Sequence, residues 1–182
     1  DYFPCVRTVS ADRACLREGY LHCANLEEDI ALARHLLATK TSCWARRGSG
    51  RRIALEQAVH PLVEDASPLT LALDGKGAFI SGQNGIGKST LLRTVGINLI
   101  AARAFGFCYA EAAELPALPV FASMQNDDSL LGGESSYMSE VRRAQELLAV
   151  SQQPDGAIFI IDEIFRGTNH LESVYATAAV LA

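Results

Sequence analysis

The spacing of apolar and polar residues divides the chain into an N-terminal helical part and a longer part in which strands and helices alternate. Over residues 25–38 the apolar positions share one face of a helix; they are Leu26, Ile30, Ala33, Leu36 and Leu37. Asn25 is a candidate N-cap, and the acids that follow it suit the positive end of a helix dipole. The arginine-rich run 46–52 predicts a turn or linker, and a solvated loop is favoured there over a phosphate contact.

From Ile53 onward the pattern predicts an α/β fold. The predicted strands are 69–73, 78–81, 120–123 and 157–161, and the predicted helices are 88–104, 135–150 and 171–182. The last strand is entirely apolar, as in the central strands of parallel sheets. We therefore expect a mostly parallel sheet flanked by helices over residues 53–182, preceded by a helical segment over residues 1–52.

The strongest chemical signal is a phosphate-binding loop of the form G-x-x-x-x-G-K-[ST]. Its residues are Gly82, Gln83, Asn84, Gly85, Ile86, Gly87, Lys88 and Ser89, and Thr90 follows them. The glycines allow backbone N–H groups to curl around phosphate oxygens, and the following helix adds its positive end. Lys88 is expected to reach the β- and γ-phosphates, and the Ser89 hydroxyl to bind Mg²⁺. The predicted ligands are ATP and Mg²⁺.

A second signal is the acidic pair at the end of the apolar strand 157–161. In enzymes with a phosphate loop, the first acid of such a pair helps to hold Mg²⁺ and the second orients the attacking water. Asp162 is therefore the predicted magnesium ligand beside Ser89, and Glu163 the predicted general base.

The net charge and the cysteines limit which partners and which cellular compartment are expected. The net charge is −5, so DNA, if it is a partner, is expected to be held by regions outside this chain. No apolar run is long enough to cross a membrane, and no signal peptide is expected. The five cysteines form no C-x-x-C pair, which favours free thiols over zinc or disulfides and predicts the cytoplasm.

These motifs together resemble the ATPase domain of MutS-like proteins, an ABC-class domain. The resemblance covers roughly residues 55–182 and rests on the phosphate loop and four further segments: His60–Glu64, Asp127–Asp128, Gly133–Glu140 and Asp162–Thr168. It implies an ATPase that works as a homodimer in DNA mismatch repair or a similar process. It also implies that the helix over residues 25–38 is the end of a lever arm, and that a final strand with a switch histidine lies beyond residue 182.

The resemblance assigns further roles at the dimer interface. Ser135 would be the signature serine, which contacts the γ-phosphate bound by the partner subunit; the alternative reading is a helix N-cap. Asp127 and Asp128 would belong to the loop leading into it. The segment Arg166–Thr168 would link the two sites along the interface, although a solvated loop arginine is the alternative for Arg166.

Departures from the common family pattern leave the function open among three readings. Gln83 stands where proline is usual and Phe165 where glycine is usual, and residues 94–98 with 166–169 resemble a divergent MutS-like branch. The first reading is a DNA-processing ATPase, and the second is a nucleotide-gated interaction module without repair activity. The third is an ABC transporter subunit, which Ile164 after the acidic pair argues against.

Overall fold

The computed structural model describes residues 10–48, 50–124, 136–152 and 156–162. The chain divides into two compact units, Asp1–Lys40 and Thr41–Ala182. Residues 41–52 therefore group with the second unit, whereas the sequence pattern placed the domain boundary after residue 52. The likeness of the first unit to a lever arm stays a prediction.

The described part of the first unit is one long helix, α2 (Arg13–Ala38), which ends where the backbone N–H of Thr39 donates to the Leu36 carbonyl. The helix was predicted, but its predicted start was wrong. The N-cap is Asp12 and not Asn25; residues 13–24 contain no proline, and Ala14, Leu16 and Glu18 are among the better helix formers there. None of the residues of α2 is buried.

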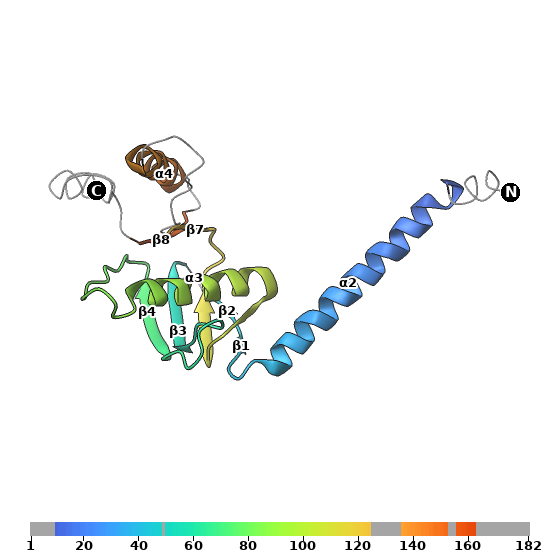
Figure 1. The fold of residues 1–182 in the computed structure, drawn as a ribbon, viewed down its shortest axis with the longest axis horizontal. Helices are drawn as coiled ribbons and strands as arrows, with labels where there is room; N and C mark the ends of the chain where they lie inside the picture. The colour runs from blue at the N-terminus through green and yellow to red at the C-terminus, as the bar shows by residue number, and fades with distance from the viewer. Residues whose placement is uncertain (1–9, 49, 125–135, 153–155, 163–182) are drawn as a thin grey trace. The chain divides into compact units, whose positions relative to one another are not determined.

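The second unit contains a four-stranded sheet in the order β2-β6-β3-β4 (Figure 1). Its strands are β2 (Arg46–Arg47), β3 (Arg52–Ala58), β4 (Leu69–Asp74) and β6 (Ala112–Leu115). Strand β3 is antiparallel to both β4 and β6, and only β2 and β6 are parallel. A separate two-stranded pair joins β1 (Cys43–Trp44) to β5 (Phe107–Cys108), also antiparallel.

The expectation of a mostly parallel sheet is therefore wrong for the described strands. Strands β3 and β4 follow each other along the chain and are joined by residues 59–68, and consecutive strands can pair antiparallel without a crossover helix. The arginine-rich run is also more regular than predicted, since it contributes β2 and the first residue of β3.

The predicted parallel pairing is found between β7 (Val120–Ser123) and β8 (Ile158–Ile161). The two strands are in register, and Phe121 and Phe159, which lie directly opposite each other, stack with their ring centroids 5.9 Å apart. Helix α4 (Ser136–Ser151) precedes β8 and confirms the helix predicted over residues 135–150.

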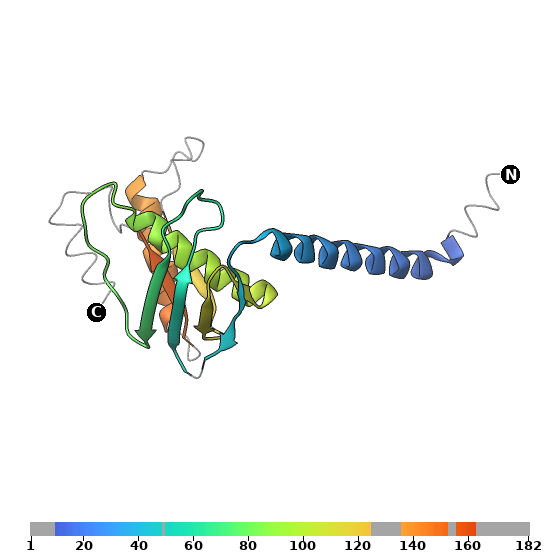
Figure 2. The same cartoon turned by 90° about the horizontal axis from the view of Figure 1, so that it is seen from below.

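Helix α3 (Lys88–Phe105) lies between the four-stranded sheet and the β7–β8 pair (Figures 1 and 2). Its buried residues Val95 and Leu99 join a core with Leu55 of β3 and Ile160 of β8. The approach to β8 is close, because a Cβ built on Gly96 would lie 3.1 Å from the Ile160 Cδ1 atom. The helix predicted over residues 88–104 is thus confirmed.

The predicted strand over residues 78–81 is not formed. These residues have no regular secondary structure and are exposed, and the Phe79 side chain is 86% accessible. An apolar segment becomes a strand only where a neighbouring strand pairs with its backbone, and no described strand pairs with this one.

Candidate functional site

The predicted phosphate loop connects the segment after β4 to the first turn of α3. Two of its glycines have positive φ angles, 84° at Gly85 and 101° at Gly87. L-residues with a side chain rarely adopt such angles, whereas glycine does so at no steric cost. At Gly82 the constraint is space, because an added Cβ would lie 3.3 Å from the Ile86 Cγ2 atom. The glycine spacing of the motif therefore matches the backbone geometry of the loop.

The Lys88 ammonium group is held by the loop itself. Its Nζ donates to the Gly82 carbonyl at 2.6 Å and to the Gln83 carbonyl at 3.0 Å. The side-chain oxygen of Asn84 is a third acceptor, at 3.4 Å. An ammonium group has three donors, and the loop supplies one acceptor for each of them. When a phosphate binds, its anionic oxygens would replace the loop oxygens as the hydrogen-bond acceptors of the Lys88 ammonium group.

The first turn of α3 faces the same loop. Gly87 is the N-cap and offers no side-chain acceptor to the first amides of the helix. These amides have no partner within a helix, and a helix N-terminus carries a partial positive charge. The half-buried Ser89 belongs to this turn. Amides, dipole and Lys88 therefore form a site suited to a bound anion of phosphate type.

Asp162 follows directly after β8, as predicted. Its backbone N–H donates to the Ser123 carbonyl at 2.9 Å, which holds it at the carboxyl end of the parallel pair. Since α3 packs on Ile160 of the same strand, the helix that begins at the loop and the strand that ends at Asp162 share one core. Ligand sites in α/β folds lie at the carboxyl ends of strands.

The remaining predicted residues lie outside the described part of the chain. They are Asp127, Asp128, Ser135, Glu163, Arg166, Gly167 and Thr168. Their roles stay predictions.

The chemistry of the donors fits magnesium better than a metal with an all-protein shell. In the described ranges no three histidine, cysteine, aspartate or glutamate side chains gather into a metal site. Mg²⁺ usually keeps several waters and takes one or two protein oxygens together with substrate phosphates. The Ser89 hydroxyl and the Asp162 carboxylate are oxygen donors of this kind.

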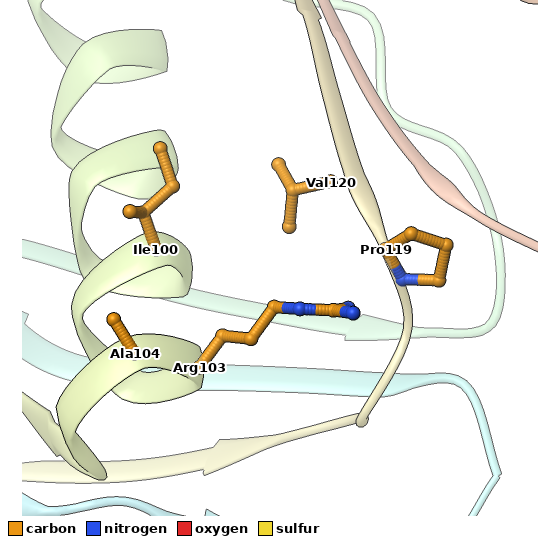
Figure 3. Close-up of a pocket in the computed structure, with 5 residues that line it drawn as sticks. All are labelled: Ile100, Arg103, Ala104, Pro119 and Val120. Atoms are coloured by element: carbon orange, nitrogen blue, oxygen red, sulfur yellow. The ribbon is translucent and has the colours of Figure 1, made fainter. Parts of the chain in front are cut away.

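A pocket elsewhere on α3 does not belong to this site. It has a volume of about 430 Å³. Figure 3 shows its lining: Ile100, Arg103 and Ala104 of α3, Val120 of β7, and Pro119, which directly precedes β7. Ile100 lies roughly 18 Å along the helix axis from Lys88, at 1.5 Å per residue. The phosphate loop is therefore recognised by its backbone geometry and not by this pocket.

Sequence reasoning did not assign a role to Asn98, a polar residue that the fold buries completely. The signal was present, because Asn98 interrupts the apolar run from Val95 to Ala102. A buried amide requires hydrogen-bond partners, so such an interruption marks a specific tertiary contact.

A glycine-rich loop around a lysine, at the start of a helix that packs on a strand ending in an acid, defines a P-loop nucleotide-binding domain. The family profile "MutS domain V" matches residues 78–182, which is more than half of the chain. The chain belongs to the MutS family and carries this ABC-type ATPase domain.

Curated relatives agree with this assignment. The chain is 35% identical to "Endonuclease MutS2" of Thermus thermophilus over 84% of its own length and 21% of that protein. It is 31% identical to "DNA mismatch repair protein MutS" of Thermus thermophilus over 92% of its length and 20% of that protein. The chain thus spans about a fifth of the relatives that it matches.

Two further expectations concern the cysteines and membrane-spanning segments, and the structure bears on both only in the described ranges. In the described ranges Cys15, Cys23, Cys43 and Cys108 have free thiols, and the expectation of free thiols stays a prediction. Among the described helices none is long and apolar enough to cross a bilayer.

Proposed function

We propose that this chain is the nucleotide-binding part of a MutS-like ATPase that binds ATP with Mg²⁺ and transfers the γ-phosphoryl group to water. The observation that carries the proposal is the Lys88 ammonium group held at the centre of a glycine-curved loop at the start of α3. The MutS domain V match supports it independently.

Each site residue has a defined task in this proposal. The loop amides and Lys88 bind the phosphates, and positioning with charge neutralisation lowers the barrier. Ser89 and Asp162 hold Mg²⁺, which when bound neutralises charge on the phosphate oxygens. Glu163 orients the attacking water and accepts its proton.

The proposal extends to an assembly larger than this chain. Ser135 completes the site of a partner subunit in a homodimer, and DNA is held by regions outside this chain, in agreement with its net charge of −5. The printed names of the relatives give two activities, mismatch repair and endonuclease, for proteins that share this domain. Nucleotide hydrolysis is the step that such a shared domain supplies, and we place it in the cytoplasm.

Nucleotide binding by matched lysine variants tests the proposal. Lys88→Ala removes the cation inside the loop, whereas Lys76→Ala removes an exposed lysine before it. By titration calorimetry with ATP and Mg²⁺ we expect roughly 100-fold weaker binding for Lys88→Ala, since a charge-assisted contact contributes about 1.5–3 kcal/mol. Lys76→Ala should stay close to wild type. Absence of binding to the wild-type chain at millimolar ATP would overturn the proposal.

The general base has its own test. Glu163→Gln keeps the shape of the side chain but cannot accept a proton. We expect unchanged ATP affinity, loss of steady-state hydrolysis and accumulation of a dimer in the presence of ATP. A variant that hydrolyses ATP at the wild-type rate would remove Glu163 from the proposed mechanism.

The second candidate is a nucleotide-gated interaction module without repair activity. The departures at Gln83 and Phe165 and the higher identity to the MutS2 protein than to the MutS protein of Thermus favour a divergent branch. DNA binding by the full-length protein at increasing salt separates the candidates, because phosphate contacts give a steep salt dependence.

A further inference from the structure

Asn98 lies on α3, ten residues after Lys88, and its side chain is fully buried with 0% exposure. A buried amide group has two N–H donors and one carbonyl acceptor to satisfy. All three have partners here, and no buried side-chain nitrogen or oxygen in the described ranges lacks one. The partners lie on three different segments of the second unit.

The side chain of Asn98 closes a ring of three hydrogen bonds. The Val59 N–H donates to the Tyr109 carbonyl at 2.8 Å, and the Tyr109 N–H donates to Asn98 Oδ1 at 2.7 Å. Asn98 Nδ2 then donates to the Val59 carbonyl at 3.4 Å. The second Nδ2 proton goes to the Thr94 carbonyl at 2.9 Å.

This ring lies three residues beyond the last pair of the β3–β6 ladder and keeps its register. Val59 is three residues after Glu56 and Tyr109 three residues before Ala112, and Glu56 pairs with Ala112 in the β3–β6 ladder. An antiparallel pair of this type normally exchanges two direct N–H···O=C bonds. Here the second bond is relayed through the Asn98 amide, which stands in for a peptide group.

The ring joins α3 to the segment that leaves the sheet after β3. Val59 directly precedes His60, whose Nδ1 accepts the Leu62 N–H at 3.2 Å and whose carbonyl accepts the Val63 N–H at 3.2 Å. On the other side, the Cys108 thiol donates to the backbone carbonyl of Asn98 at 3.4 Å. One residue of the helix thus fixes both strand ends.

We propose that Asn98 is a positioning residue that couples nucleotide binding at the phosphate loop to the turn over residues 60–63. The helix between Lys88 and Asn98 is continuous and about 15 Å long. A shift or rotation of α3 when its N-terminus takes up phosphate is passed through the ring to Val59. This inference rests on the proposed function, because it needs a ligand at the loop.

The test compares variants that differ in the ring alone. Asn98→Leu keeps the number and branching of the side-chain heavy atoms and removes all three side-chain hydrogen bonds. Thr94→Val is the matched control, because it removes the bond from Thr94 Oγ1 to the Thr90 carbonyl on the same helix and leaves the ring intact. Circular dichroism and a direct nucleotide titration establish that each variant is folded and binds ADP with Mg²⁺.

The first readout is amide hydrogen exchange of the segment 56–64 in the whole chain, with and without saturating ADP and Mg²⁺. In wild type and Thr94→Val we expect at least threefold slower exchange at residues 59–63 when nucleotide is bound. In Asn98→Leu the nucleotide still binds but exchange there does not change. Equal protection in Asn98→Leu, or no protection in nucleotide-bound wild type, overturns the coupling.

The second readout needs no nucleotide and uses Asn98→Asp. A protonated carboxyl group can accept from the Tyr109 N–H and donate to the Val59 carbonyl, whereas a carboxylate only accepts and is disfavoured by burial. We expect the melting temperature of this variant, relative to wild type, to rise as pH falls from 8 to 5.

The two readouts separate the inference from the proposed function. If wild type binds no nucleotide, the proposed function fails, and the pH profile of Asn98→Asp still decides whether the amide bridge exists. A relative melting temperature that does not depend on pH overturns the bridge even where nucleotide binds normally.

Discussion

Helices α2 and α3 are both evident from the sequence, yet they differ in what surrounds them. In α2 no residue is buried, and Leu26 and Leu37 are 60% and 87% exposed. In α3 Val95 and Leu99 are buried against two sheets, and Leu99 is 3% exposed. Apolar periodicity therefore predicts a helix but not the partner that covers its apolar face. The phosphate loop lies at the start of the helix that packs into the core.

The largest expected effect tests this difference directly with one substitution in each helix. Leu99→Ala should lower the free energy of unfolding by about 2–5 kcal/mol, because it leaves a cavity in the core. Leu26→Ala should change it by less than about 0.5 kcal/mol, since the side chain is mostly exposed. Denaturant unfolding followed by Trp44 fluorescence measures the core unit, where Trp44 lies against Gly106 at the end of α3. Similar losses for both variants would contradict the comparison.

A smaller effect is expected at the contact between α3 and β8. Gly96→Ala places a methyl group 3.1 Å from Ile160 Cδ1, so we expect a net loss of about 1–3 kcal/mol from overpacking. Ile160→Val removes the Cδ1 methyl group. In the double variant it should therefore recover much of the stability that Gly96→Ala loses. The same unfolding measurement gives the coupling energy, and strict additivity of the two changes would show that the contact is not tight.

The third effect concerns alkaline pH. Burial raises the pKa of the Cys108 thiol from 9.0 to about 12, with a smaller contribution from Cys43. A raised thiol pKa means that the folded state keeps the proton that the unfolded state releases. This contribution to stability is therefore complete below pH 9 and is lost between pH 9 and 12.

Unfolding measured at pH 8 and 10 should show a loss on the order of 1 kcal/mol from this group, after allowance for partial solvent screening. Cys108→Ala should flatten that part of the profile. Cys23→Ala, at an exposed thiol of α2, is the control and should leave it unchanged. If the free energy of unfolding of Cys108→Ala fell as steeply between pH 8 and 10 as that of wild type, the loss would come from other groups.

The smallest effect is expected in α2 and has the opposite sign. A Cβ built on Gly19 would meet no atom within 4 Å, so Gly19→Ala adds helix propensity without a clash. We expect a gain of about 0.5–1 kcal/mol in helix stability, seen as a higher melting temperature of the far-ultraviolet signal. A loss there would indicate a packed partner on α2.

Much of the site could be predicted from the sequence because its chemistry is local. The glycines that need positive φ, the lysine and the helix they precede lie within a few residues of each other, so the motif specifies its own geometry. Asp162 was found in the same way, at the end of an apolar strand. Packing was harder to predict, since β3 pairs on one side with β6, which lies more than fifty residues further along the chain.

The sequence by itself therefore determined the phosphate loop, helix α3, the β7 and β8 strands and the MutS likeness. Only the tertiary structure decided that residues 78–81 stay exposed, that β3 pairs antiparallel on both sides, and that Asn98 bridges Val59 and Tyr109. The physical reason is the distance along the chain between the residues that interact. Backbone conformation and helix periodicity depend on neighbours in sequence, whereas strand pairing and the partners of a buried amide depend on segments that only folding brings together.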